Sequence, residues 1–527
     1  ETLTSWKSAR LIPFHKGGDT SDTNNYRPIS IINSIAKIFE KLIFNQLSTY
    51  LTDHNILSPH QSGFRPSHST TTALLKFTND ILSAADSNML TGAIFIDLSK
   101  AFDMVDHYLL LDKLYAIGLS SNSLLYLNSF LHNRSQCVSF LGSQSDFKII
   151  DKDVPQGSSL GPLLFSIFIN DLSQICSDCQ IHLYADDTVL YFSSSDISQI
   201  QYSLQSDFNL VQGWFSSNKL LLNKRKSYNM LFCTQPDPSL LSNWSISLLD
   251  VTTIEKIEEL KYLGLWLDSQ LSCKFHINSI TKKIFGCLKS LYRSADCFSQ
   301  EVRKRIITQL IFPILDYADV IYGNTFETNL RSLNVLYNSL CRFVLRCPYR
   351  THHCLMYESL NWPAPKSRRQ LHWLTLIFKC IHFNFPSYLK DLLIPFRGSF
   401  FYSLRHMDQL FLVTPRISKE IGRRAFKFKA PSDWNNLPSS LRSITSLHIF
   451  KSSLITHFQT SCSCFLTVLG LTLLTVQCTI YMCVFVYKYV LYTLLVHASR
   501  CIYKRVYSML MCTNVYLYFS QRDLFLF

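Results

Sequence analysis

The sequence is short of charge and of glycine. Of its 527 residues, 17% are charged and 15 are glycine, and both figures are low for a folded protein. Nevertheless, 47% of the residues are hydrophobic, which excludes an intrinsically disordered chain. The length excludes a small scaffold held by disulfides and suffices for about three to four folding units.

The sequence also lacks a cysteine framework, a signal peptide and a long internal repeat. Its 17 cysteines are scattered through apolar runs, such as Leu231-Phe-Cys233, which is typical of reduced core thiols. We therefore expect a reducing, intracellular location. Because the chain starts at Glu1 without a methionine, we expect it to be a piece of a longer protein.

Charge is absent from one long segment near the C-terminus. No charged residue lies between Phe465 and Tyr487, and residues 461–527 carry five basic side chains and one acidic one, a net charge of +4. About 20 apolar residues suffice to span a bilayer, so residues 465–487 would fit a membrane anchor. Their irregular mixture of Phe, Tyr, Cys, Val and Leu also fits read-through into sequence never selected for folding, the interpretation that we favour.

The remainder of the chain is basic. The whole sequence has 51 Lys+Arg against 37 Asp+Glu, a net charge of +14, which leaves +10 for residues 1–460. Clustered basic side chains release counterions from a phosphate backbone on binding. The charge balance therefore favours a polyanionic partner such as a nucleic acid.

Strand-like and helix-like patterns alternate through the first 270 residues. They predict a basic hairpin over residues 6–29, an amphipathic helix over 35–51, a buried strand over 91–97, an apolar helix over 163–172 and a strand pair over 182–191. Farther along, apolar residues at helical spacing alternate with Lys282, Lys283, Lys289 and Arg293, which predicts a basic amphipathic helix over 277–293.

Three carboxylates stand out in this pattern. Asp97 ends the buried strand, and Asp186 and Asp187 lie at the turn of the strand pair. An isolated Asp-Asp turn usually reflects turn chemistry alone. If the strands are neighbours in one sheet, however, the three carboxylates converge at its rim, where divalent cations such as Mg²⁺ would relieve their repulsion.

Seven blocks in a fixed order resemble the reverse transcriptases of non-LTR (LINE-type) retrotransposons, most closely the jockey and CR1-like groups. The blocks are Asn25-Tyr-Arg-Pro-Ile-Ser30, Gln61-Ser-Gly-Phe-Arg65, Phe95-Ile-Asp-Leu-Ser-Lys-Ala-Phe-Asp103, Pro155-Gln-Gly-Ser-Ser-Leu-Gly-Pro-Leu-Leu-Phe165, Tyr184-Ala-Asp-Asp187, Leu222-Asn-Lys-Arg-Lys-Ser227 and Lys261-Tyr-Leu-Gly264. The segment 434–450 also resembles the end of such proteins. Two departures are Ser227, where threonine is usual, and Ser159, where an aliphatic residue is commoner.

The resemblance implies an α+β fold of the right-hand polymerase type, with fingers, a palm built on an antiparallel sheet, a helical thumb and a helical C-terminal extension. We assign residues 1–270 to fingers and palm, 271–400 to the thumb, 401–460 to the extension and 461–527 to the hydrophobic basic tail. The resemblance further implies an RNA-directed DNA polymerase located in the nucleus and cytoplasm. Its expected partners are an RNA template, a DNA primer or target and dNTPs. The endonuclease domain common in this family has no counterpart in the sequence.

The resemblance also implies roles for single residues. Asp97, Asp186 and Asp187 would hold two catalytic Mg²⁺ ions, for which Mn²⁺ could substitute. The expected dNTP-binding residues are Lys16, Arg27, Phe102, Gln156, Gly157 and Lys226, with Phe102 filling the space that a 2′-hydroxyl needs. The expected nucleic-acid contacts are Lys261, Tyr262 and Gly264 of a primer-grip hairpin and Lys282, Lys283, Lys289 and Arg293 of the basic helix. The alternative interpretation of each lysine is an ordinary solvated side chain.

Two other functions stay open at this point. One is a degenerate copy that binds nucleic acid without polymerising, and the other is a membrane-anchored protein with a vestigial palm. Cys347, His352, His353 and Cys354 also invite interpretation as a zinc site, but their spacing matches no common finger and leaves little room for tetrahedral closure.

Overall fold

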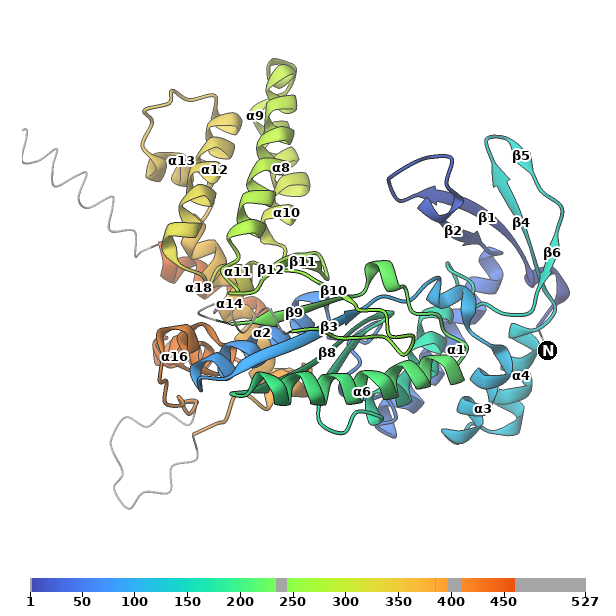
Figure 1. The fold of residues 1–527 in the computed structure, drawn as a ribbon. Helices are drawn as coiled ribbons and strands as arrows, with labels where there is room; N and C mark the ends of the chain where they lie inside the picture. Colours follow the sequence, from blue (N-terminus) through green and yellow to red (C-terminus); the bar gives the residue numbers. More distant parts are fainter. Residues whose placement is uncertain (1, 234–243, 384, 397–409, 460–527) are drawn as a thin grey trace, which may run out of the picture. The chain divides into compact units, whose positions relative to one another are not determined.

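A computed structural model describes residues 2–233, 244–383, 385–396 and 410–459 (Figure 1). Contacts between residues divide the chain into a compact unit, 1–456, and a second unit, 457–527. The hydrophobic segment 465–487 lies outside the described residues. Within the described part of the chain, no helix combines the length and the apolar character that a membrane crossing requires.

The centre of the first unit is a five-stranded sheet in the order β10-β9-β3-β8-β7. Its strands are β3 (Leu90–Ile96), β7 (Gln180–Tyr184), β8 (Asp187–Ser194), β9 (Tyr228–Phe232) and β10 (Glu255–Lys256). All neighbours are antiparallel except β9 and β10. This sheet confirms the predicted palm, including the buried strand and the strand pair around the two adjacent aspartates.

Helices cover both faces of the central sheet. On one face, α6 (Ile197–Ser217) packs so closely that a Cβ added to Gly92 of β3 would lie 2.6 Å from Ile200. On the other face, α2 (Thr70–Asp86) places the Phe77 ring 5.8 Å from Phe95 and 5.1 Å from Tyr191. Burial of both faces explains why β3 is continuously apolar instead of alternating.

A second sheet forms the fingers. It runs in the order β2-β1-β4-β5, with β6 also paired to β4. The strands are β1 (Ser8–His15), β2 (Tyr26–Ile31), β4 (Arg134–Phe140), β5 (Ser143–Gln144) and β6 (Lys148–Ile150). The β1–β2 pair confirms the predicted N-terminal hairpin, and β1 also pairs in parallel with β4.

The helix α1 (Ser34–Asp53) confirms the predicted element, but its first half turns a different face inward. Ile35, Ile38 and Leu42, which the apolar pattern predicts to be buried, are each more than half exposed. The buried face instead carries Glu40, whose carboxylate accepts hydrogen bonds from Ser158 and Ser159. Farther along α1 the pattern is confirmed, because Leu47 is buried and Ile43 packs against the hydrophobic core.

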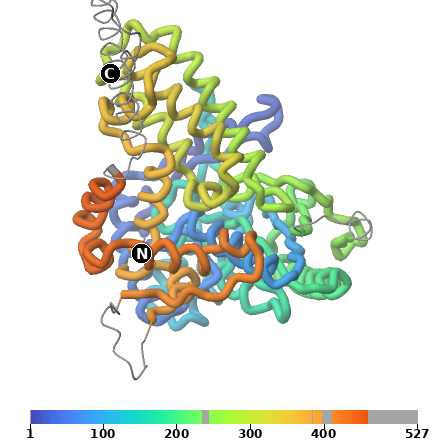
Figure 2. The backbone as a smooth tube through the Cα atoms, turned by 90° about the vertical axis from the view of Figure 1, so that its left-hand side faces the viewer, coloured from blue at the N-terminus to red at the C-terminus, as the bar shows by residue number. Residues whose placement is uncertain are grey.

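The described residues beyond 268 are almost entirely helical. Two long helices, α8 (Lys274–Arg293) and α12 (Glu327–Leu345), pack side by side (Figures 1 and 2). The predicted apolar face of α8 is confirmed, because Ile277, Ile280 and Ile284 are buried. A hairpin of β11 (Glu259–Tyr262) and β12 (Leu265–Asp268) precedes α8.

The remaining helices complete the fingers, palm, thumb and extension. They are α3 (His107–Ala116), α4 (Ser121–Leu131), α5 (Gly161–Phe168), α9 (Gln300–Ile306), α10 (Phe312–Asp316), α11 (Asp319–Tyr322), α13 (His353–Leu360), α14 (Pro365–His382), α15 (Ser387–Lys390), α16 (Phe426–Asn435), α17 (Ser439–Arg442) and α18 (Leu447–Gln459). The C-terminal extension docks on α2, because the Asp86 carboxylate accepts the backbone N–H groups of Ser418 and Lys419. The domain boundaries at residues 270, 400 and 460 stay predictions.

Candidate active site

The three predicted carboxylates meet at one end of the central sheet. Ile96, the last residue of β3, pairs with Thr188 of β8, so the same register places Asp97 opposite Asp187. Asp186 lies in the tight turn between β7 and β8, one residue before Asp187. Residues far apart in the sequence are therefore brought to one rim, as the strand pattern predicts.

The segment 61–65 packs against the turn that carries Asp186 and forms a hydrogen bond to its backbone. Ala185 adopts a left-handed conformation, with φ of 56°. The buried Gln61 side chain accepts hydrogen bonds from the N–H groups of Gly63, at 2.7 Å, and Ala185, at 3.2 Å. A Cβ on Gly63 would lie 2.2 Å from the Ala185 nitrogen, so glycine is required for this close approach.

Burial changes the acidity of all three carboxyl groups. Burial is the largest effect and raises the pKa of each. Burial, together with the charges of Asp186 and Asp97, raises the pKa of Asp187 to about 7. Three carboxylates that resist joint ionisation, with only oxygen ligands, suit hard divalent cations such as Mg²⁺.

A polar segment after α6 fixes the position of Asp97. Asn223 Nδ2 donates to Asp97 Oδ2 at 2.9 Å, and the Asp97 N–H donates to Ser227 Oγ at 3.2 Å. The same segment brings Lys226 close enough to lower the pKa of Asp97, against the larger raising effect of burial. The sequence pattern singled out Lys226 but did not predict that Asn223 contacts Asp97.

The fingers hairpin supplies two further cations. Lys16 and Arg27 are exposed at the end of the β1–β2 pair, where the Lys16 N–H donates to the Asn25 carbonyl oxygen at 2.8 Å. Burial lowers the pKa of Lys16, and the nearby positive charges of Arg27 and Lys226 lower it further. Arg27 and Lys16 are also near enough to Asp186 to oppose the rise of its pKa, and their binding of a triphosphate stays a prediction.

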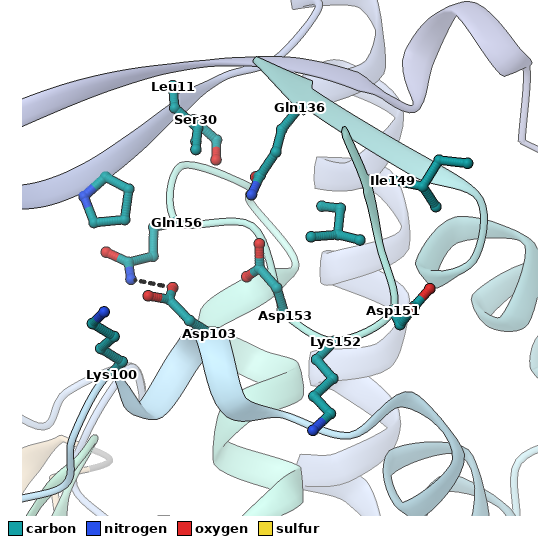
Figure 3. A pocket seen from close by; sticks show the side chains of 12 residues that line it. Leu11, Ser30, Lys100, Asp103, Gln136, Ile149, Asp151, Lys152, Asp153 and Gln156 are labelled. Atoms are coloured by element: carbon teal, nitrogen blue, oxygen red, sulfur yellow. Dashed lines mark hydrogen bonds between the residues drawn. The ribbon is translucent and has the colours of Figure 1, made fainter. Parts of the chain in front are cut away.

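The turn 156–157 connects the fingers to the palm. The Ser30 N–H donates to the Gln156 carbonyl oxygen at 2.7 Å, and Gln156 Nε2 donates to Asp103 Oδ1 at 2.8 Å (Figure 3). Gly157 has φ of 130°, and a Cβ there would lie 2.4 Å from the Ser30 oxygen. The turn lines a cavity of about 440 Å³ together with Lys100, Asp103 and Asp153.

Phe102 follows the strand that ends on Asp97 and is held by two other rings. Its ring stacks on Phe165, with centroids 4.5 Å apart, and meets the edge of Phe64 at 6.1 Å. The side chain is partly exposed, so one edge is available to a ligand. A ring fixed in this way suits the predicted steric role.

The primer-grip prediction needs one correction. Tyr262 is only 5% exposed and its ring packs against Phe77 and Phe95, so the prediction that it contacts nucleic acid is wrong. Burial of large aromatic side chains under α2 explains the difference. Lys261 is exposed on β11, and Gly264 has φ of 82° in the hairpin turn.

The basic residues predicted on the thumb helix are all exposed. They are Lys282, Lys283, Lys289 and Arg293. The opposite face of α8 carries the buried isoleucines, so these cations lie on the solvent side of an amphipathic helix.

Among the described residues, two groups of side chains have three possible metal-ligand atoms within 4.8 Å of one another. Neither group contains Asp97, Asp186 or Asp187. One is His352, His353 and Cys354, within the segment considered for zinc, and Cys347 is not part of it. The other contains Asp316, which pairs with Arg368 at 2.8 Å and is thus neutralised by a cation of the chain itself. The candidacy of the trio therefore rests on ligand type, burial and mutual effect on pKa.

Asp153 is a strained residue at the edge of this region. Its φ is 112°, a backbone conformation suited to glycine. The residue is 9% exposed, and its carboxylate points into the cavity of Figure 3. The carboxylate oxygen Oδ1 has no hydrogen-bond partner. Burial, with the charge of Asp103, raises the pKa of Asp153 from 3.8 to about 7. The folded chain therefore holds this proton more tightly than the unfolded chain does, and stability falls as the pH rises between these two values.

We accordingly expect Asp153→Gly to stabilise the protein by about 3 kcal/mol at pH 8 and by less at pH 5, because it removes both backbone strain and a buried charge. Melting temperatures at the two pH values measure the effect. Asp151→Gly, at an exposed neighbour, is the control and should show no gain. A gain that is equal at both pH values, or a loss, would contradict the role assigned to the buried carboxylate.

Comparison with known proteins agrees with this geometry. Residues 14–267 match the family described as reverse transcriptase (RNA-dependent DNA polymerase). The chain is 30% identical over 370 residues to a probable RNA-directed DNA polymerase from transposon BS of Drosophila melanogaster, covering 68% of this chain and 40% of that protein. It is also 30% identical over 358 residues to the RNA-directed DNA polymerase from the mobile element jockey of the same species, covering 66% and 38%.

The chain thus spans about 40% of the length of these curated relatives. Among solved structures, apo telomerase from Candida tropicalis matches at 13% sequence identity and a TM-score of 0.37, covering 72% of this chain and 63% of that one. Residues 14–267 are therefore a reverse transcriptase domain, similar in sequence to the RNA-directed DNA polymerases of jockey-like non-LTR retrotransposons.

Proposed function

We propose that the chain is an RNA-directed DNA polymerase that extends the 3′-hydroxyl of a primer along an RNA template with dNTPs. The observation that carries the proposal is the meeting of Asp97, Asp186 and Asp187 with cations from the fingers hairpin and from the segment after α6. Carboxylates facing cations across one site suit a triphosphate, which binds divalent cations on one side and basic side chains on the other.

Three groups of side chains at the site have different roles in nucleotidyl transfer. The three carboxylates would hold two divalent cations, Mg²⁺ or Mn²⁺, which supply activation of the primer hydroxyl and neutralise charge on the leaving pyrophosphate. Lys16 and Arg27 bind and orient the triphosphate. Lys226, beside Asp97, places a positive charge where the pyrophosphate departs.

The thumb would hold the primer–template duplex. The exposed cations of α8 project from one side of a long helix and contact phosphates without reading sequence. Template RNA and primer DNA are thus the partners that we propose for this face.

Phe102 is expected to exclude ribonucleotides. Phe102→Ala opens the space that the ring fills, so preference for dTTP over UTP on poly(rA)/oligo(dT) should fall about 10- to 100-fold. The ratio of kcat/KM values for the two nucleotides measures this. Phe147→Ala, at an exposed phenylalanine between β5 and β6, is the control. An unchanged ratio in the Phe102 variant would show that another group selects the sugar.

The test of the proposal is primer extension by the full chain on poly(rA)/oligo(dT), with binding of the same duplex measured in parallel. We expect incorporation of dTTP that depends on template and on Mg²⁺. Tight binding without any extension would instead identify a protein that binds nucleic acid and does not polymerise.

A further inference from the structure

We infer that Glu40 of α1 is a positioning residue, which holds the turn 156–157 in the geometry required for nucleotide incorporation. The inference rests on the proposed function, because that turn is expected to line the incoming nucleotide. Glu40 belongs to none of the seven motif blocks, and glutamate side chains are mostly exposed in folded proteins. It is nevertheless only 2% exposed.

One carboxylate oxygen of Glu40 accepts two hydrogen bonds from the residues that follow the turn. Ser158 Oγ and the Ser159 N–H each donate to Glu40 Oε2 at 2.7 Å. Hydrogen bonds to an ionised acceptor are about twice as strong as those between neutral groups. Glu40 therefore restrains one side chain and one backbone group at the same point of the chain.

The restraint continues into α5. Ser158 Oγ accepts the N–H groups of Leu160, at 3.0 Å, and Gly161, at 3.1 Å, and so caps the start of this helix. The α5 helix also carries Phe165, on which the Phe102 ring stacks. The Glu40–Ser158 bond thus lies between the fingers helix and two groups of the proposed nucleotide site.

A buried arginine lies within electrostatic range of Glu40 without forming an ion pair with it. Arg134, at the start of β4, is nearly inaccessible, and its Nη1 donates to the Phe130 carbonyl oxygen at 3.2 Å. Burial lowers the pKa of Arg134, and the nearby carboxylates of Glu40 and Asp153 oppose this effect. A buried carboxylate that has both a counter-charge and hydrogen-bond donors is a fixed element of the structure.

Glu40 ties residues 158–159, directly after the turn, to α1. On the opposite side, the turn is held by the backbone bond from Ser30 to Gln156 and by the close approach of Gly157 to the Ser30 oxygen. Those backbone contacts fix the distance between the turn and β2. The bonds to Glu40 fix the orientation of the backbone at residues 158–159. A displacement of about 1 Å in a substrate-positioning group can cost about 100-fold in rate.

The decisive variant is Glu40→Gln, which keeps the size of the side chain and one acceptor oxygen but removes the charge, so that both hydrogen bonds lose about half of their strength. We expect KM for dTTP to rise about 10-fold, with the Kd for primer–template within about twofold of wild type, because the altered turn faces the nucleotide. Exchange of the Ser159, Leu160 and Gly161 amide hydrogens, which needs no catalytic activity, should become at least about 10-fold faster. Glu301→Gln, at an exposed salt-bridged glutamate of α9, is the matched control and should change none of these.

Ser158→Ala is the second variant and removes the hydroxyl that reaches Glu40. We expect it to raise KM in the same direction, and the double variant should be less impaired than the product of the two single effects. Wild-type KM and wild-type amide exchange in Glu40→Gln or, should that variant not fold, in Ser158→Ala would overturn the inference. Failure of the wild-type chain to extend a primer would instead refute the proposed function, and amide exchange would still decide whether Glu40 holds the turn.

Discussion

Replacing Asp186 with asparagine is expected to lower the rate of deoxynucleotide incorporation at least 1,000-fold, a loss of about 4 kcal/mol in transition-state stabilisation. Asparagine keeps the shape of the side chain but removes an anionic oxygen ligand. The turn itself should persist, since Gln61 holds it through the Ala185 backbone N–H and not through Asp186. The measurement is the single-turnover rate of dTTP addition to oligo(dT) on poly(rA).

Stability separates this effect from unfolding. Burial and like charges oppose ionisation of the trio, so removing one charge should leave the melting temperature unchanged or higher. Asp146→Asn, at an exposed loop aspartate, is the control and should retain both rate and stability. Incorporation by Asp186→Asn within 10-fold of wild type would show that this carboxylate takes no part in the chemistry, by the same relation between rate and barrier.

The second large effect is expected for Gly63→Ala. The new Cβ would lie 2.2 Å from the nitrogen and 2.9 Å from the Cα of Ala185, and both are backbone atoms that cannot rotate away. We expect a loss of about 3 kcal/mol in the free energy of unfolding, and about a 100-fold fall in incorporation rate because the hairpin that bears Asp186 must shift. Urea unfolding and the single-turnover assay measure the two effects.

Gly213→Ala provides a matched comparison for this substitution. Gly213 lies in α6, and a Cβ there would meet no atom within 4 Å. Because alanine favours the helix over glycine, this variant should be as stable as wild type or up to about 1 kcal/mol more stable. If Gly63→Ala behaves in the same way, the hairpin has more freedom than its close contact with residues 61–65 indicates.

Periodicity predicted most of the regular elements that position the site. The apolar run before Asp97 and the alternation around the two adjacent aspartates correspond to β3, β7 and β8, and the helical spacing of isoleucines corresponds to α8. These elements form where apolar burial dominates, and burial is what a hydrophobic pattern reports. In the first half of α1, where Ile35, Ile38 and Leu42 are exposed and Glu40 is buried, the pattern did not predict burial correctly.

The meeting of the three carboxylates at one rim of the sheet could be predicted, because they follow apolar strands and match family motifs. The contacts of Gln61, Asn223 and Glu40 could not be predicted, although Gln61 and Asn223 lie in motif blocks, since each forms hydrogen bonds to residues more than 100 positions away. Such partners are set by packing of the whole unit. Tyr262 was predicted to contact nucleic acid, but its ring packs against Phe77 in the aromatic core. This packing also depends on residues distant in the sequence.

The most direct test of polymerase function is nucleotide addition by the wild-type chain on poly(rA)/oligo(dT), with each of the four dNTPs offered singly, in Mg²⁺ and after chelation by EDTA. We expect dTTP to be added in preference to the other three nucleotides, and addition to stop on chelation and in Asp97→Asn. Incorporation that ignores the template base, or that is equal in Asp97→Asn and wild type, would contradict a template-directed polymerase built on Asp97, Asp186 and Asp187.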